Sequence, residues 1–233
     1  MNSDRIRDNL LSVHDRIAVA ARRVGRRPES VSLVAVTKKW PVELIRPLIE
    51  AGARDLGENY PQELWRKVEA LADAPGPLRW HLIGHLQGNK ARRTLPLVRA
   101  IHAVDSLKLL RTLDELAAEF SDPPVVCLQV NTSGEEAKHG WSDDAILADA
   151  EAIAACQRIR VVGLMTMAAW GTDAESARPS FVRLRAVRDA LAIRSGLALP
   201  ELSMGMSNDF ETAVEEGATL VRVGSALLEG VDA

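Results

Sequence analysis

The chain has 233 residues, of which 47% are hydrophobic, and a formal net charge of −3. This length suffices for one large α/β domain, and the slightly acidic balance gives no broad electrostatic case for binding nucleic acid or an anionic membrane. A basic cluster, Arg22, Arg23, Arg26 and Arg27, falls near the end of the first helical pattern, where it is typical of a solvated helix end. We therefore expect no nucleic-acid partner.

The first residues begin a charged amphipathic pattern rather than an apolar signal core, and no stretch approaches the roughly 18 apolar residues of a membrane span. Cys127 lies in an apolar run and Cys156 in a helix-like segment, and neither has a CxxC partner, as expected of reduced core residues. These features predict a soluble, cytoplasmic protein without disulfides or membrane contact. We also expect it to be a monomer.

Short apolar runs alternate with helical patterns along the chain. An amphipathic helix is expected over about Arg5 to Val24, and eight strands follow, each before a helix-compatible stretch. The strands are expected near 31–37, 53–57, 79–84, 100–104, 124–131, 160–167, 200–204 and 219–224. Eight alternations without a Gly/Ser linker favour a single (β/α)8 TIM-type barrel over 1–233, with an extra N-terminal helix. An open doubly wound sheet is the alternative, weakened by the lack of G-x-G-x-x-G after the first strand.

Lys38 stands where the first apolar run ends, and Pro41 opens the next helical pattern. Ligands of α/β proteins bind at the carboxyl ends of strands, and an ε-amine partly shielded by apolar neighbours loses its proton more easily. Lys38 is therefore a candidate to form a Schiff base with a carbonyl. The competing interpretation is an ordinary solvated lysine in a loop.

Other predicted strand ends are also polar. In a barrel they would share one mouth with Lys38; they are Glu58, Asn59, His81, Asn131, Ser203 and Arg222. Two glycine-containing segments, 203–209 and 222–226, follow the last two strands, where barrels often bind phosphate. Simple helix capping by Ser207 or Asn208 and a turn at Gly224 would explain each segment alone. Together they favour a ligand that carries both a phosphate and a carbonyl.

Five motifs, in order and over essentially the whole chain, resemble the YggS/PROSC family of pyridoxal phosphate homeostasis proteins. They are A-V-T-K at 35–38, G-E-N-Y at 57–60, W-H-L-I-G-H-L-Q-G-N-K at 80–90, G-L-M at 163–165 and S-M-G-M-S at 203–207. The resemblance implies a fold-type III barrel similar to the N-terminal domain of alanine racemase, without the racemase's second domain. It also implies pyridoxal 5'-phosphate (PLP) as cofactor.

The resemblance carries roles onto particular positions. Lys38 would hold PLP as a Schiff base, Asn59 would face the ring substituents, and Arg222 would meet the pyridine nitrogen. The phosphate would be surrounded by Ser203, Ser207, Gly224 and Ser225. His81 completes the set of expected cofactor-binding residues, because it lies at a strand end.

Arg222 bears on function, since a permanently charged guanidinium disfavours a proton on the ring nitrogen and so weakens the cofactor as an electron sink. We expect a protein of intracellular PLP homeostasis that supplies PLP-dependent apoenzymes without robust catalysis. One alternative is a racemase-like enzyme, which needs a second acid/base; Tyr60, the only tyrosine, is a candidate. Another is a class I aldolase that uses Lys38 on a sugar phosphate.

Two further details of the sequence concern the neighbouring lysines Lys38 and Lys39 and the histidines His81 and His85. The family commonly shows Lys-Thr-Lys or a similar triplet where this chain has Lys38, Lys39 and Trp40. Strand alternation would put Lys38 and Lys39 on opposite faces if the strand continued that far. His81 and His85 are four apart, but Gly84 lies between them at a strand end, so no metal site is expected.

Overall fold

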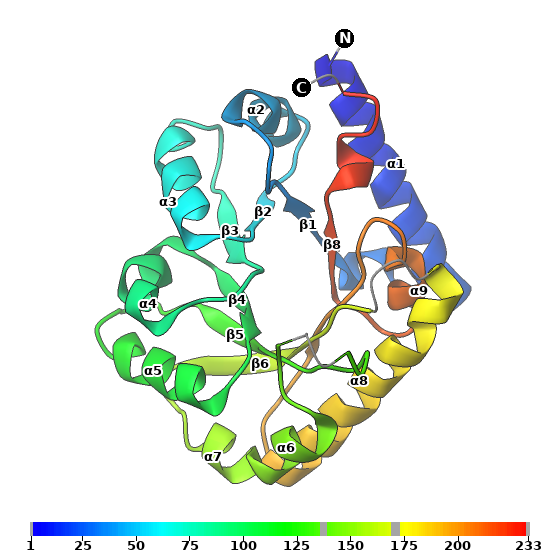
Figure 1. The fold of residues 1–233 in the computed structure, drawn as a ribbon. Helices are drawn as coiled ribbons and strands as arrows, with labels where there is room; N and C mark the ends of the chain where they lie inside the picture. Colours follow the sequence, from blue (N-terminus) through cyan, green and yellow to red (C-terminus); the bar gives the residue numbers. More distant parts are fainter. Residues whose placement is uncertain (1, 136–138, 169–172, 232–233) are drawn as a thin grey trace.

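The computed structural model describes residues 2–135, 139–168 and 173–231. Eight parallel strands form a closed barrel in sequence order, each paired with its neighbours in the chain and β8 paired with β1 (Figure 1). The strands are β1 (Ser32–Val36), β2 (Asp55–Glu58), β3 (Arg79–Leu82), β4 (Ala100–Val104), β5 (Val125–Gln129), β6 (Arg160–Met165), β7 (Glu201–Ser203) and β8 (Leu220–Val223). The predicted TIM-type barrel is confirmed.

Helices surround the barrel. They are α1 (Asn2–Arg23), α2 (Val42–Glu50), α3 (Pro61–Ala70), α4 (Gly88–Thr94), α5 (Leu107–Ala117), α6 (Asp143–Ala148), α7 (Ala150–Ala154), α8 (Ala174–Ser195) and α9 (Phe210–Glu215), with short 3-10 turns η1 (Pro28–Ser30), η2 (Leu95–Leu97) and η3 (Ser225–Leu227). A closed parallel barrel needs such an outer layer, because each strand buries both of its faces.

The N-terminal helix takes a definite place in this layer. In the described chain β8 is followed by the 3-10 turn η3, and α1 packs between α9 and α2 beside it (Figure 1). Ile6, Leu10, Val13 and Ile17 recur on one face of α1 and are buried there. The expected extra helix therefore fills the position that the eighth helix of a barrel would occupy.

Local signals explain where the elements begin. In α5, the Ser106 hydroxyl accepts from the Leu109 amide as an N-cap. Leu109, Leu110 and Leu113 then recur at helical spacing and are buried in the core. The same pattern of one apolar stripe per helix builds the continuous core between helices and strands. The interior of the barrel is different, since it holds buried polar side chains, among them His81, His102, Ser203 and Arg222.

The first strand is shorter than expected. It ends at Val36, and the chain then turns through Lys38 and Lys39. Strand alternation therefore cannot decide which lysine faces the mouth, because neither lysine is in a strand. Lys39 has φ +68°, the only positive φ of a non-glycine residue within the described ranges.

Two further findings concern membrane crossing and the two cysteines. Within residues 2–135, 139–168 and 173–231, no helix has the length and apolar character needed to cross a bilayer. Cys127 is buried and Cys156 half-buried, and both are free thiols. Burial raises the pKa of the Cys127 thiol to about 12, so this side chain behaves as a core residue.

Candidate functional site

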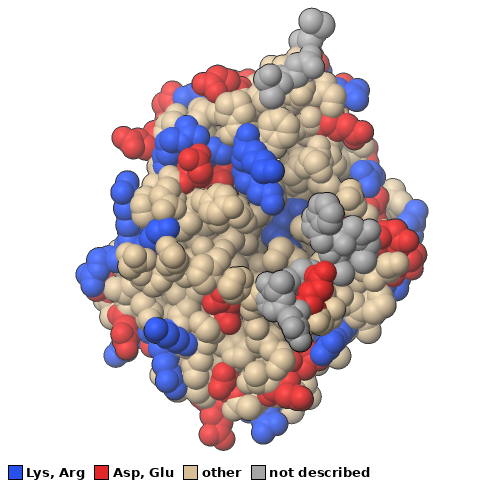
Figure 2. All heavy atoms as spheres, in the orientation of Figure 1, with Lys and Arg blue, Asp and Glu red and all other residues tan. Residues whose placement is uncertain are grey.

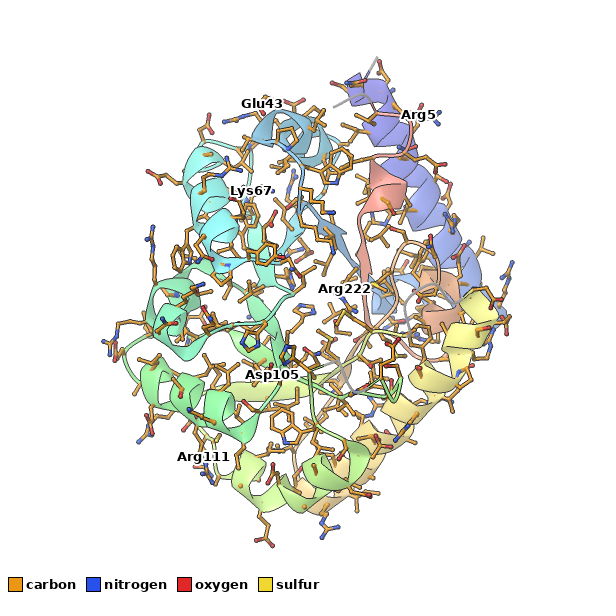
Figure 3. The ribbon with its side chains drawn as sticks, viewed as in Figure 1. Arg5, Glu43, Lys67, Asp105, Arg111 and Arg222 are labelled. Atoms are coloured by element: carbon orange, nitrogen blue, oxygen red, sulfur yellow. The ribbon has the colours of Figure 1, made fainter. Side chains whose placement is uncertain are left out.

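The site lies at the carboxyl ends of the strands, around the barrel axis. Figure 2 shows a hollow at the centre of this face, with basic side chains on its floor and along part of its rim. In Figure 3 the Arg222 side chain lies at the centre of the barrel, Lys67 reaches inward from α3, and Asp105 lies below them. Arg222, one of the polar strand ends expected from the sequence, thus lies at the centre of this face.

Lys38 is exposed in the turn that follows β1. The backbone around it is fixed on both sides: the Thr37 amide donates to the Gly57 carbonyl at 3.0 Å, and the Trp40 amide donates to the Thr37 carbonyl at 3.0 Å. An exposed amine on a fixed turn is available to react with a carbonyl ligand. The structure is therefore consistent with Lys38 as the reactive lysine.

A buried ion pair supports this turn from behind. The Lys67 ammonium donates to Glu58 Oε1 at 2.6 Å and to the Thr37 carbonyl at 2.7 Å. The Thr37 hydroxyl also donates to Glu58 Oε1, at 2.6 Å. All three residues are only 1% exposed. We call Thr37, Glu58 and Lys67 the Lys67 cluster; it fixes the residue immediately before Lys38.

The sequence reasoning missed Lys67. A signal was present, because Pro61, Leu64 and Lys67 are spaced three apart and share the buried face of α3. A lysine on the apolar stripe of a helix is unusual and indicates a buried acidic partner.

Asn59 lies directly after β2 and packs closely against the segment after β3. A Cβ atom on Gly84 would come within 2.1 Å of the Asn59 carbonyl oxygen and 2.6 Å of its side-chain Oδ1. Only glycine allows this approach. The motifs at 57–60 and 80–90 therefore interlock through Asn59 and Gly84, and this contact fixes Asn59 at the mouth.

The segments after β7 and β8 meet, as the sequence predicted for a phosphate pocket. The Ser207 hydroxyl oxygen accepts from the backbone amides of Gly224 and Ala226, at 3.2 and 3.4 Å. These two amides could equally donate to an anionic oxygen in place of Ser207 Oγ. A side chain at Gly224 would be crowded, since a Cβ would lie 3.2 Å from the Val36 carbonyl oxygen. Backbone amides that converge in this way are typical donors to a phosphate.

Arg222 is buried in the barrel interior, and its guanidinium is held by two acceptors. It donates to Ser203 Oγ at 2.7 Å and to the Thr166 carbonyl at 2.8 Å. Burial lowers the pKa of Arg222 to about 10, so the side chain is still a cation at neutral pH. Ser203, which was expected beside the phosphate, instead bonds Arg222 and His102 inside the barrel. Its hydroxyl therefore does not face the amides of Gly224 and Ala226.

His81 also lies deeper than expected. Its Nδ1 bonds His102 Nε2 at 2.9 Å and its Nε2 bonds Asp55 Oδ1 at 3.0 Å, so both ring nitrogens already have buried partners. The side chain cannot bond a ligand at the mouth without breaking one of these contacts. His102 and Asp55 were not among the residues expected in the site, because nothing local in the sequence links them to His81.

The mouth also holds a second histidine pair. His85 Nδ1 bonds Asp105 Oδ2 at 2.7 Å, and the His85 ring stacks on His139 with centroids 5.3 Å apart. In the part of the chain that the structure describes, no group of three or more His, Cys, Asp or Glu side chains could hold a metal ion.

Tyr60, the candidate second acid/base, is 63% exposed.

Comparisons with known proteins agree with this geometry. Residues 8–230 match the family described as alanine racemase, N-terminal domain. The pyridoxal phosphate homeostasis protein of Pseudomonas aeruginosa is 41% identical over 227 residues, covering 97% of this chain and 96% of that protein. The protein of the same name in Escherichia coli K12 is 35% identical, with 97% of each chain covered.

Solved structures give the same result. PipY of Synechococcus elongatus, in a structure with PLP bound, is 38% identical and superposes with a TM-score of 0.84 over 95% of this chain and 99% of PipY. Alanine racemase from Corynebacterium glutamicum, 20% identical with a TM-score of 0.72, shows the shared fold; this chain covers 63% of that protein. On sequence and structure together, the chain belongs to the pyridoxal phosphate homeostasis proteins, a family built on the N-terminal domain of alanine racemase.

Proposed function

We propose that this protein binds PLP covalently through Lys38 and serves intracellular PLP homeostasis. The observation that carries the proposal is the junction made by Ser207 with the amides of Gly224 and Ala226. It supplies donors for a phosphate in the same mouth that holds an exposed lysine and a buried arginine. The relatives named for PLP homeostasis and the PLP-bound PipY structure support the same ligand.

The residues divide the binding work. Lys38 would form the covalent link, Asn59 would lie beside the ring substituents, and Ser207, Gly224 and Ser225 would bind the phosphate. Arg222 would lie toward the ring nitrogen. His81 and Ser203 act beneath the ligand, through Arg222, because their hydrogen bonds run inside the barrel.

Bound PLP supplies an aldehyde that reacts reversibly with amines and a ring that can delocalise a carbanion. A guanidinium that stays charged at neutral pH opposes protonation of the ring nitrogen, so Arg222 limits this delocalisation. Holding and releasing the cofactor suits this site better than carbanion chemistry. We infer a PLP carrier that supplies apoenzymes, acts as a monomer in the cytoplasm and has no robust turnover.

The test is an absorption spectrum of the purified protein with PLP, followed by borohydride reduction and peptide mapping of the modified lysine. We expect a near-visible band that borohydride bleaches, with the reduced adduct on Lys38. In Lys38→Ala the band should vanish while the unfolding free energy changes by less than about 0.5 kcal/mol, because Lys38 is exposed. The matched control Lys39→Ala should keep the band.

Three results would contradict the proposal. An adduct on Lys39 would move the covalent link, and a protein that shows no band with excess PLP would reject the cofactor. Exchange of an amino acid's α-proton in deuterated solvent at enzymatic rates would replace the carrier with a racemase-like enzyme.

A further inference from the structure

A polar path crosses the inside of the barrel. It starts at Arg222 and passes through Ser203, His102 and His81 to Asp55, with successive distances of 2.7, 2.7, 2.9 and 3.0 Å. These five residues come from five different strands, β8, β7, β4, β3 and β2. We call the four residues beyond Arg222 the histidine chain. It connects the ligand end of the barrel with the amino ends of the strands.

The two ends of the path differ in their surroundings. Ser203 and His102 are fully buried, and Arg222 is 4% exposed. Asp55 is the first residue of β2 and reaches the solvent-accessible amino end of the barrel, where it also pairs with the half-exposed Arg79 at 2.6 Å. The path therefore has a cation beneath the ligand site and an anion at the opposite end.

The anion fixes the direction of hydrogen-bond donation. Burial alone would raise the pKa of Asp55, but hydrogen bonds from Arg79 and His81 outweigh it and lower the pKa to about 2. At neutral pH Asp55 is a carboxylate that can only accept, so His81 donates to it from Nε2. A neutral His81 then accepts at Nδ1.

The remaining roles follow in turn. His102 must donate from Nε2 to His81, so its Nδ1 accepts from the Ser203 hydroxyl. The Ser203 oxygen accepts from Arg222, which has no acceptor of its own. With this assignment every donor along the path has an acceptor, and both imidazoles carry their hydrogen on Nε2.

If every hydrogen bond between His81 and Ser203 were donated in the opposite direction, the Ser203 hydroxyl would be left without an acceptor. A proton added to His81 would make Nδ1 a donor to His102, and His102 would then donate to Ser203. The Ser203 hydroxyl hydrogen would have no acceptor, since within the described ranges this buried side chain bonds only His102 and Arg222. A buried donor left without an acceptor loses its hydrogen bond to water and gains none in the protein, so this direction is disfavoured. Burial, together with nearby His81 and Arg222, also holds the pKa of His102 well below its usual value.

We propose that Asp55, His81 and His102 are positioning residues for Arg222, which they fix through Ser203 as a donor toward the ring nitrogen of the cofactor. In the one direction of donation that satisfies the path, the Ser203 hydroxyl hydrogen points to His102 and its oxygen is left to accept from Arg222, so a guanidinium that moved away would leave this buried oxygen without a donor. The cofactor role rests on the proposed function. The chain itself is a property of the protein without cofactor.

The first test is nuclear magnetic resonance of the cofactor-free protein with ¹⁵N-labelled histidine at neutral pH. Of the five histidines, His81 and His102 should be neutral Nε2–H tautomers with slowly exchanging ring protons. Spectra of His81→Asn and His14→Gln assign the signals; His14 is exposed on α1 and lies outside the path. An imidazolium or an Nδ1–H tautomer at His81 or His102 would overturn the proposal.

The second test uses a matched pair of substitutions at His81 and measures the PLP dissociation constant from the absorption band. Asparagine places a polar atom near the position of Nδ1, so His81→Asn can still accept from His102. Glutamine places one near Nε2, so His81→Gln keeps the contact with Asp55 but leaves the His102 donor unpaired. We expect His81→Gln to weaken binding about tenfold and His81→Asn about threefold or less.

Equal effects of the two substitutions, or no effect of His81→Gln, would overturn the positioning role. His14→Gln should bind PLP like the unaltered protein. If the unaltered protein bound no PLP, the proposed function and the cofactor role of the histidine chain would both fail. The tautomers would still show whether the chain exists, so the two failures can be told apart.

Discussion

Two buried polar systems flank the candidate site, and they are built differently. Beside Lys38, the Lys67 cluster buries a full ion pair, with Glu58 and Lys67 each 1% exposed and 2.6 Å apart. Beneath the candidate site, the charges of Arg222 and Asp55 are separated by the Ser203 hydroxyl and the two imidazoles of the histidine chain. One system concentrates charge at a single contact, and the other spreads it across the barrel.

The difference predicts how each system fails. Removing one partner of a buried ion pair leaves a charge without compensation, which is among the costliest changes in a protein. Interrupting a row of neutral groups strands a donor or an acceptor but no full charge, and costs less. The Lys67 cluster should therefore govern stability, while the histidine chain should chiefly tune how the cofactor is held.

The largest effect is expected from Lys67→Met. This change leaves Glu58 buried without its counter-charge and frees the Thr37 carbonyl, and it should lower the unfolding free energy by about 3–5 kcal/mol in urea denaturation. The control Arg66→Met alters an exposed neighbour on the same helix and should cost less than about 0.5 kcal/mol. The double variant Glu58→Gln/Lys67→Met should recover part of the loss. A loss below 1 kcal/mol in the single variant would remove the contrast between the two systems.

A smaller loss is expected from His102→Leu. The change interrupts the histidine chain and leaves the Ser203 hydroxyl and His81 Nδ1 unpaired, so we expect a cost of about 1–3 kcal/mol. The unfolding free energy and the PLP dissociation constant should be measured on the same sample. His14→Leu serves as control, because His14 lies outside the barrel. A cost greater than that of Lys67→Met would contradict the comparison.

Acid should weaken the histidine chain through Asp55. Its pKa is lowered from 3.8 to about 2 in the folded protein, so the folded state binds a proton less readily than the unfolded chain. The stabilisation, about 2 kcal/mol, is fully present above the unfolded pKa and is lost as pH falls from about 4 to 2. Unfolding free energies of the unaltered protein and Asp55→Asn should therefore converge near pH 2. A constant gap between them down to pH 2 would show that the carboxylate does not act through its charge.

The smallest effect on stability is expected from Lys39→Gly. This substitution tests whether the backbone of the turn after β1 is strained at Lys39. Lys39 has φ +68°, a conformation that costs a residue with a Cβ about 1 kcal/mol or more, while glycine adopts it freely. Because glycine also gains entropy in the unfolded chain, the net stabilisation should be about 1 kcal/mol or less. Lys39→Ala keeps the Cβ and should not stabilise the protein. Equal stabilities of the two variants would show that the turn carries no strain.

Much of the fold could be predicted because its signals are local. The period of the apolar pattern, read over windows of a few residues, placed all eight strands near their observed positions. The meeting of the segments at 203–209 and 222–226 was also predictable, since neighbouring parallel strands end at the same face of a barrel. Lys38 was found by the same reasoning, as a residue at a strand end.

The role of the deeper residues could not be predicted in this way. Ser203 and His81 were correctly placed on strands, but a strand pattern gives the face on which a residue lies and not its depth in the barrel or its partners there. Their partners lie far along the chain: Ser203 bonds His102 across 101 residues and His81 bonds Asp55 across 26. Lys67 was missed for a related reason, since its partner Glu58 comes from a different element.

The sequence by itself thus determined the alternation of strands and helices, the motifs that mark the family, and the position of Lys38 in the turn that follows the first strand. Only the tertiary structure decided that α1 fills the place of the eighth helix, that Lys67 supports the turn before Lys38, and that Asp55, His81 and His102 lie in line beneath Arg222. The physical reason is that closing the barrel sets the stagger between strands. That stagger selects which inward side chains come within hydrogen-bonding distance.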